Sequence, residues 1–334
     1  MRRLSWNMPL MACLGAIALA LGACGGSDKP ADSQADGSDG SPFKIGISQF
    51  VEHPSLDLIK SGFMDVLAEA GLKVEYDEQN AQAEPSLAAT IASSFAADSS
   101  IDLMLAIATP TAQALVQQEK TRPVLFAGIT DPVAAELVPA LEGSGTNVTG
   151  TSDLNPDAKP VQLIKDVIPD VKTIGVLYSS AETNSEVQVA AYKAEAEPLG
   201  IEISEQAIAN SSEVATGAQA LEGVDAILIP TDNTVVSALE AVIAMAESTR
   251  TPVFSADAES VDKGTIATRG ISYYELGRRT GEMALQILVD GVKPGDIPTL
   301  VVRDTELKVN SEAAGRQGIT LSEDLLAQAV DVTK

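Results

Sequence analysis

The sequence has few of the residues from which metal centres and disulfides are built. It contains one histidine and two cysteines. One histidine with no cysteine near it does not indicate a metal site, because such sites gather several His, Cys or carboxylate ligands. Cys13 lies in an apolar run that we expect to be removed, which leaves Cys24 without a disulfide partner. We therefore expect neither a metal nor any other cofactor.

Glycine-rich phosphate-binding loops are also missing. Two apolar runs that predict strands continue as LMLAIATPT and AILIPTDNT, with Thr and Pro where a Walker or dinucleotide loop requires glycine. Of the groups that catalysis needs, only carboxylates are abundant, and in so acidic a chain their proximity means little. We expect a protein that is not an enzyme.

Basic residues are scarce relative to acidic ones. The chain has 22 Lys and Arg against 47 Asp and Glu, and a formal net charge of −25. Such a field repels phosphate backbones and anionic lipid headgroups. Nucleic acid is therefore excluded as a partner.

The N-terminal segment has the form of an export signal. Arg2 and Arg3 precede the apolar run MACLGAIALALGAC, which is too short to span a bilayer and ends in small residues. We predict a signal peptide over residues 1–23. The LGAC sequence resembles a bacterial lipobox, in which Cys24 becomes the lipid-carrying N-terminus; the alternative is an ordinary signal peptide that contains a cysteine.

A polar segment follows the predicted cleavage site. Residues 24–42 are rich in Gly, Ser and Asp, with almost nothing apolar to bury. We predict a flexible acidic tether. The protein is then exported and held by lipid at the outer face of the cell membrane, or on the periplasmic side of a bacterial envelope.

The rest of the chain repeats itself. The segments that begin at Lys44 and Thr173 both read as a buried strand, a polar loop, an amphipathic helix and a glycine before a new strand. Further on, SIDLMLAIATPT is echoed by GVDAILIPTDNT, which aligns Asp102 with Asp225. Alternating strands and helices predict a parallel sheet with helices on both faces. The expected fold class is thus α/β, with two doubly wound parallel-sheet lobes joined by the crossover GTNVTGTSDL.

Several segments carry a family resemblance: IGISQFVEHPSLD, AIATPTAQA, VLFAGITDPV, NVTGTSDL, IPTDNTVVSALEAV and GISYYELGRRTGEMALQIL. The chain resembles the solute-binding lipoproteins of bacterial ABC importers, in the group with tryptophan- and tyrosine-binding members. The resemblance implies a type I periplasmic-binding fold with three crossings between the lobes and ligand in the cleft. It places the helix from Tyr273 to Asp290 in the first lobe and a strand over 300–308 between the lobes. The lobes would then comprise residues 43–148 plus 272–300, and 149–271 plus 301–334.

In paired parallel-sheet lobes, the carboxyl ends of the strands in both halves line one cleft. The loops after the matched strands, together with the start of the last long helix, supply the expected ligand-binding residues. These are Gln49, Phe50, His53, Ala108, Thr109, Thr111, Thr130, Asp131, Tyr178, Asn184, Thr231, Asp232, Asn233, Ser255, Asp257 and Tyr273.

An amino acid ligand would need partners for both of its charged groups. Thr109 followed by Pro110 reads as a helix N-cap and first residue, whose free N–H groups suit a carboxylate. A buried ammonium requires a carboxylate, and Asp232 or Asp257 could supply it. We favour Asp232, which lies in the loop opposite Thr109. The alternative for both acids is a simple N-cap role.

Aromatic walls and the single histidine complete the expected cleft. Phe50, Tyr178 and Tyr273 could stack on a ligand ring, although only 4% of the chain is aromatic. His53 is expected in a loop near the cleft mouth, with the alternative that it donates to ligand.

The predicted function is an extracytoplasmic solute-binding lipoprotein of an ABC importer. It would be a monomer that captures an amino acid, with tryptophan or tyrosine favoured, and delivers it to the permease. A repressor of the same two-lobed architecture is excluded because a basic DNA-binding segment is absent and an export signal is present. A surface sensor or binding module for another small metabolite, not coupled to a permease, remains the alternative.

Overall fold

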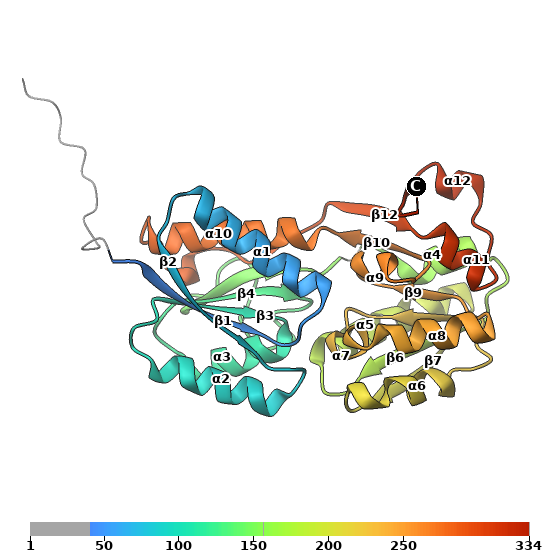
Figure 1. Ribbon diagram of the computed structural model, residues 1–334, viewed down its shortest axis with the longest axis horizontal. Helices are drawn as coiled ribbons and strands as arrows, with labels where there is room; N and C mark the ends of the chain where they lie inside the picture. The colour runs from blue at the N-terminus through green and yellow to red at the C-terminus, as the bar shows by residue number, and fades with distance from the viewer. Residues whose placement is uncertain (1–40, 156, 334) are drawn as a thin grey trace, which may run out of the picture. The chain divides into compact units, whose positions relative to one another are not determined.

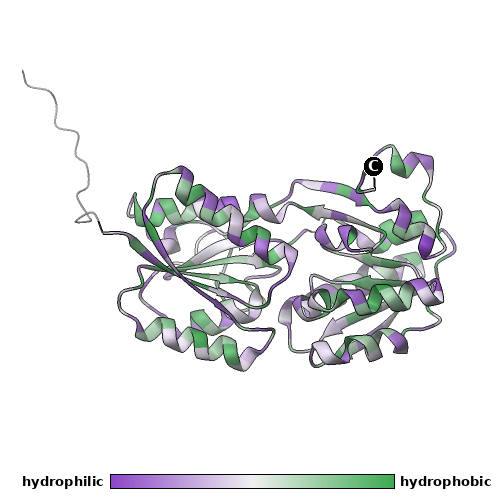
Figure 2. Cartoon of the chain, viewed as in Figure 1, coloured by the Kyte–Doolittle hydropathy of each residue, from purple (hydrophilic) through white to green (hydrophobic). Residues whose placement is uncertain are grey.

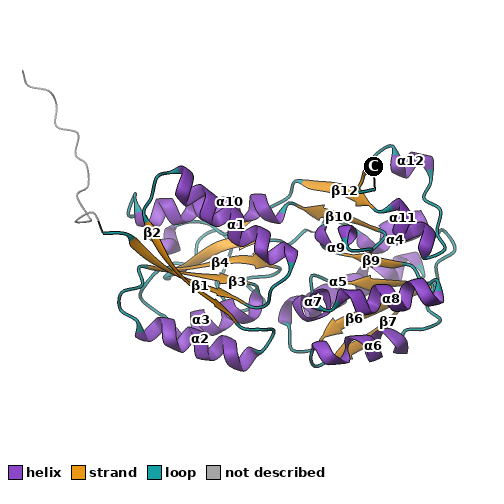
Figure 3. Ribbon diagram, viewed as in Figure 1, coloured by secondary structure: helices purple, strands orange, loops and turns teal. Residues whose placement is uncertain are grey.

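The computed structural model describes residues 41–155 and 157–333. The predicted signal peptide and Cys24 lie outside the described residues, as does most of the predicted tether. Within the described ranges, every helix is too short or too polar to cross a membrane. Figure 3 shows helices covering the faces of the strands, as expected for an α/β protein.

The first lobe is built on one six-stranded sheet in which all pairings are parallel, with the order β11-β5-β4-β3-β1-β2. Strands such as β3 are buried along their whole length, because helices cover both faces of a parallel sheet. Figure 1 shows α1 and α10 on one face and α2 and α3 on the other. The strands are β1 (Phe43–Gln49), β2 (Val74–Asn80), β3 (Leu103–Ile107), β4 (Val124–Ile129), β5 (Val148–Ser152) and β11 (Leu300–Val301). The helices are α1 (Pro54–Glu69), α2 (Pro85–Ala97), α3 (Thr109–Gln118), α10 (Tyr273–Leu288) and the 3₁₀ turn η3 (Pro294–Asp296).

The second lobe contains a four-stranded parallel sheet of order β7-β6-β8-β9 and a separate three-stranded sheet of order β10-β12-β13, in which β10 and β12 are antiparallel. Its strands are β6 (Thr173–Ser179), β7 (Glu202–Ile208), β8 (Ala226–Ile229), β9 (Val253–Ser255), β10 (Ala267–Ile271), β12 (Thr305–Val309) and β13 (Val330–Asp331). Its helices are α4 (Pro160–Val167), α5 (Thr183–Ala196), η1 (Glu197–Leu199), η2 (Ser211–Glu213), α6 (Val214–Ala220), α7 (Asn233–Ser237), α8 (Leu239–Thr249), α9 (Glu259–Asp262), α11 (Ser311–Arg316) and α12 (Glu323–Leu326). Figure 2 shows hydrophobic and hydrophilic residues on the same helices, consistent with their amphipathic sequences.

The internal repeat extends to individual side chains. The Asp102 carboxylate, just before β3, accepts the Lys44 backbone N–H at 2.8 Å. The Asp225 carboxylate, just before β8, accepts the Thr173 backbone N–H at 2.9 Å. In each lobe, this hydrogen bond joins the start of one strand (β1 or β6) to the residue just before the strand that pairs with it (β3 or β8). The alignment of Asp102 with Asp225 is therefore confirmed as a structural equivalence.

The last long helix returns to the first lobe, as expected. α10 packs against α1, and two glycines lie where the backbone of one helix closely approaches the other. A Cβ on Gly62 would lie 2.2 Å from the Tyr274 carbonyl oxygen, and one on Gly277 would lie 2.1 Å from the Ile59 carbonyl oxygen. Only glycine permits this contact between the helices.

Two predicted boundaries were wrong. Residues 148–152 form β5, which pairs with β4 in the first sheet, although their Gly and Thr content suggested a crossover. Gly150 is needed there because its Cβ would lie 2.0 Å from the Phe126 carbonyl oxygen. The single strand predicted over 300–308 is two short strands, one in each lobe. We propose that the crossings lie at 153–159, 272 and 302–304.

Candidate functional site

The loops at the carboxyl ends of the strands meet between the two lobes. Hydrogen bonds join the lobes directly there. They link His53 Nε2 with Asn233 Oδ1 (3.3 Å), the Ser55 hydroxyl with Asp257 (3.3 Å) and Glu259 (3.1 Å), and the Thr130 hydroxyl with that of Thr231 (3.1 Å). We call this contact region the seam. It is the place where the sequence predicted a ligand.

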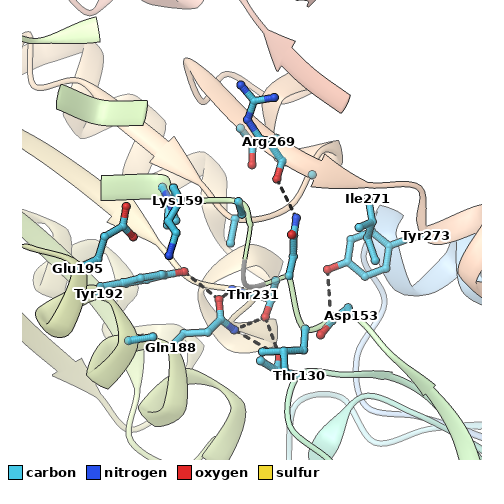
Figure 4. Close-up of a pocket in the computed structure, with 18 of the residues that line it drawn as sticks. Thr130, Asp153, Lys159, Gln188, Tyr192, Glu195, Thr231, Arg269, Ile271 and Tyr273 are labelled. Carbon is cyan, nitrogen blue, oxygen red and sulfur yellow. Dashed lines mark hydrogen bonds between the residues drawn. The ribbon is translucent and has the colours of Figure 1, made fainter. Parts of the chain in front are cut away.

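Two adjoining cavities lie at the seam. The inner cavity has a volume of about 20 Å³, and its lining includes His53 and Ser55. The outer cavity has a volume of about 430 Å³ and is lined by residues of α5, β10 and the crossing segment before α4 (Figure 4). Asp153, Thr231 and Tyr273 line both cavities. The inner cavity has room for a group about the size of a water molecule. The volume of the outer cavity is within the usual range for a small-molecule site.

Several buried polar atoms at the strand ends lack a hydrogen-bond partner. They are Ser48 Oγ, Gln49 Oε1, His53 Nδ1, Thr109 Oγ1, Asp153 Oδ1 and Asn184 Oδ1. Each lies at or shortly after the carboxyl end of a parallel strand. An unsatisfied buried polar group costs about 1–3 kcal/mol, so proteins rarely leave many together. A ligand with polar groups would satisfy them.

Asp153 is the carboxylate best placed to receive a ligand cation. It follows β5 in the first crossing segment, and its Oδ2 accepts the Tyr273 hydroxyl at 3.1 Å (Figure 4). Its Oδ1 is buried without a partner. Burial raises the pKa of Asp153, while the nearby Thr130 and Tyr273 hydroxyls act in the opposite direction. A ligand ammonium would supply the missing counter-charge.

Asp232, the carboxylate that the sequence favoured for this role, is occupied within its own lobe. Its Oδ1 accepts the Val235 N–H at 2.8 Å, which caps α7. Its Oδ2 accepts the Ser179 N–H and the Ser185 hydroxyl, each at 2.6 Å. Burial, together with the carboxylate of Glu182, raises the pKa of Asp232 to about 8. With both oxygens used, the structure favours the N-cap alternative.

Asp257 is occupied in a similar way. Its Oδ1 accepts the Ser260 N–H at 2.8 Å and its Oδ2 the Ser260 hydroxyl at 2.7 Å. Asp257 also receives the Ser55 hydroxyl from the first lobe, which makes it part of the seam. Burial and the charge of Asp257 raise the pKa of the adjacent Glu259 to about 7.

Comparison with known proteins identifies the family. The family model described as ABC transporter substrate binding protein matches residues 44–333. This chain belongs to that family.

Two relatives have similar sequence identity but differ in structural agreement. This substrate-binding protein is 41% identical to an ABC domain from Streptococcus pneumonia that was solved in complex with L-Trp. The match covers 87% of this chain and 99% of the other, with a TM-score of 0.83. At the same identity and coverage, the TM-score is 0.64 against the ligand-free, open structure of a substrate-binding protein with adhesive properties from Clostridium difficile. The backbone of this chain therefore agrees better with that of the L-Trp complex than with that of the ligand-free, open structure.

The chain is also similar to a tyrosine-binding protein from Clostridioides difficile (strain R20291). It is 40% identical over 273 residues, which span 80% of this chain and 79% of the relative.

The structure brings part of the predicted set together at the cavities. The predicted residues that line one cavity or both are His53, Thr130, Thr231, Asp232, Asn233, Asp257 and Tyr273. His53 is only 6% exposed, so it lies within the seam rather than in a loop at the cleft mouth.

The other predicted residues line neither cavity. They are Gln49, Phe50, Ala108, Thr109, Thr111, Asp131, Tyr178, Asn184 and Ser255. Most of their polar groups form hydrogen bonds with nearby residues. The Thr111 hydroxyl donates to the Ile107 and Ala108 carbonyls, and Asp131 accepts the Val133 and Ala134 N–H groups. The Ser255 hydroxyl donates to the Asp257 carbonyl, while the side-chain amides of Gln49 and Asn184 donate to Asp57 and Glu182, respectively.

The remaining differences concern two aromatic residues and one helix start. Phe50 is 1% exposed and packs in the first-lobe core rather than at the cleft. The Tyr178 hydroxyl donates to Glu205 on β7 at 3.4 Å, away from both cavities. Ala108, with φ of 81°, is the N-cap of α3, so the helix begins one residue earlier than predicted from Thr109 and Pro110.

Sequence reasoning missed Asp153, Gln188 and Tyr192. Gln188 donates to Thr130 across the seam at 3.3 Å, and its Oε1 accepts the Tyr192 hydroxyl at 2.8 Å (Figure 4). The signal was present but unused. Asn184, Gln188 and Tyr192 recur every four residues along α5, which places them on one face of that helix.

Proposed function

We propose that this substrate-binding protein is an exported lipoprotein that captures an aromatic amino acid and delivers it to an ABC permease. The family membership and the tyrosine- and L-Trp-binding relatives support the ligand class. The observation that carries the proposal is the buried, unpartnered Asp153 Oδ1 at the wall common to both cavities. A carboxylate in that position matches the ammonium of an amino acid.

The outer cavity suits the rest of such a ligand. Tyr192 and Tyr273 line it and provide aromatic surfaces against which a ligand ring can pack (Figure 4). Lys159 and Arg269 also line it, and neither forms an ion pair within the described residues. Either cation would balance the ligand carboxylate. Contacts from the ligand to both lobes then stabilise the closed arrangement of the lobes.

Titration calorimetry on the full-length protein in detergent tests the ligand class. L-Tyrosine, L-tryptophan and L-phenylalanine are compared with L-alanine and with a neutral sugar. We expect binding of at least one aromatic amino acid, much weaker binding of L-alanine because it leaves the outer cavity unfilled, and none of the sugar. Failure of every amino acid to bind would overturn the proposal.

Lipid attachment is tested separately at Cys24, which lies outside the described residues. The Cys24→Ser protein should leave the membrane fraction and appear in the soluble extracytoplasmic fraction, because it lacks the thiol that carries the lipid. Its affinity for amino acids should be unchanged. A variant that stays with the membrane would contradict the lipoprotein assignment without affecting the ligand assignment.

A further inference from the structure

The tautomer of His53 is fixed by a chain of contacts that begins at Glu182. The Glu182 carboxylate accepts the Asn233 side-chain N–H at 2.5 Å, so the amide nitrogen of Asn233 faces Glu182. The amide oxygen of Asn233 therefore faces His53 Nε2, at 3.3 Å. Because an amide oxygen can only accept, Nε2 must carry the hydrogen.

The other ring nitrogen is then a bare acceptor. Burial lowers the pKa of His53, against the opposing charges of Asp257, Glu182 and Asp57, which keeps the ring neutral. With its one hydrogen on Nε2, Nδ1 has a free lone pair. That atom is buried and has no partner. His53 and Asp153 both line the inner cavity.

We propose that the inner cavity is an ammonium subsite in which His53 Nδ1 and Asp153 Oδ1 both accept hydrogen bonds from the ligand. This inference rests on the proposed function and specifies it further. A primary ammonium has three N–H donors and is about the size of a water molecule, which is the size of group that a cavity of about 20 Å³ admits. His53 therefore accepts from ligand, whereas the alternative considered for it in the sequence was a donor to ligand.

The inference also defines which amines are excluded. A methyl group on the ammonium removes one donor and adds volume that the inner cavity lacks. We expect Nα-methyl-L-tryptophan to bind the wild-type protein at least a hundredfold more weakly than L-tryptophan. Equal affinities would overturn the placement of the ammonium in the inner cavity.

Two substitutions separate the two nitrogens of His53. The side chain of His53→Asn carries an amide oxygen near the position of Nδ1, and that of His53→Gln carries amide atoms near Nε2, where they can keep the contact with Asn233. If Nδ1 receives the ligand, His53→Gln should weaken binding of L-tyrosine or L-tryptophan about ten- to a hundredfold, the value of one charge-assisted hydrogen bond, while His53→Asn stays within about fivefold of wild type. The reverse order would show that His53 only joins the lobes.

The two proposals fail in different ways. Wild-type affinity in His53→Gln would overturn the acceptor role and leave the proposed function intact. A wild-type protein that binds no amino acid would overturn both.

Nitrogen NMR reads the tautomer directly, because the chain has a single histidine. In ¹⁵N-histidine-labelled full-length protein without a histidine tag, saturated with the L-tyrosine or L-tryptophan that it binds, we expect a neutral ring with its hydrogen on Nε2, and an Nδ1 resonance shifted from its position in the ligand-free protein. A hydrogen on Nδ1 in the ligand-bound protein, or an Nδ1 resonance that ligand does not move, would overturn the proposal.

Discussion

Replacing Asp153 with Asn should weaken binding of L-tyrosine and L-tryptophan by at least a hundredfold. The substitution keeps the size of the side chain and removes the charge opposite the ligand ammonium. Removing one partner of a buried ion pair costs about 3–5 kcal/mol, which corresponds to a loss of roughly two to nearly four orders of magnitude in affinity. Calorimetry at constant pH measures the effect.

The pH dependence gives a second test of the same residue. Because burial raises the pKa of Asp153, this carboxyl group takes up a proton at a higher pH than an ordinary aspartate does. Only the ionised carboxylate attracts the ammonium, so wild-type affinity should decrease as the pH of the assay is lowered. Asp153→Asn should show a smaller decrease.

Asp157→Asn is the matched control, since Asp157 lies in the same crossing segment but is exposed. It should bind as wild type does. Equal affinities for wild type and Asp153→Asn would return the ammonium to another acid and contradict our assignment.

Replacing Asp232 with Ala should instead destabilise the fold. The Asp232 carboxylate accepts the N–H groups of Ser179 and Val235 and the hydroxyl of Ser185, and it is fully buried. Its loss leaves two buried backbone donors and a hydroxyl without partners. We expect a decrease of about 3–5 kcal/mol in the free energy of unfolding, measured by denaturant titration without ligand.

Ser322→Ala is the control for the capping contribution. The Ser322 side chain accepts only the Leu325 N–H, at 3.2 Å, at the exposed start of α12, and its replacement should cost about 1 kcal/mol. Similar losses from the two variants would mean that Asp232 acts as an ordinary cap.

Asp232→Asn compares the two candidate ammonium partners in a single binding assay. An Asn side chain presents an NH₂ group to one of the two backbone N–H groups, so we expect this variant also to lose stability. Its ligand affinity should fall by less than that of Asp153→Asn. The opposite order would restore the assignment that the sequence alone favoured.

The sequence was sufficient to predict the fold because that inference depends on local patterns. Unbroken apolar runs such as that of β3 belong to strands covered on both faces, and the alignment of Asp102 with Asp225 marked two equivalent units. The direction of the strands then placed their carboxyl ends at one seam. The sequence did not predict that residues 148–152 form a strand of the first sheet. Gly150 suggested a loop there, but it is required because β5 lies close to the Phe126 backbone.

The sequence by itself determined that the chain forms two similar α/β units with polar strand ends, because apolar periodicity is a property of neighbouring residues. That these ends face each other across one cleft was implied by the family resemblance. Only the tertiary structure decided which acid has a buried oxygen without a hydrogen-bond partner. Asp153 and Asp232 both follow buried strands and look alike in sequence, yet Asp232 is surrounded by donors from Ser179, Ser185 and Val235 while one oxygen of Asp153 has none. Hydrogen-bond satisfaction depends on residues distant in the chain, so only the folded protein distinguishes the acid that caps a helix from the acid with an unpartnered oxygen.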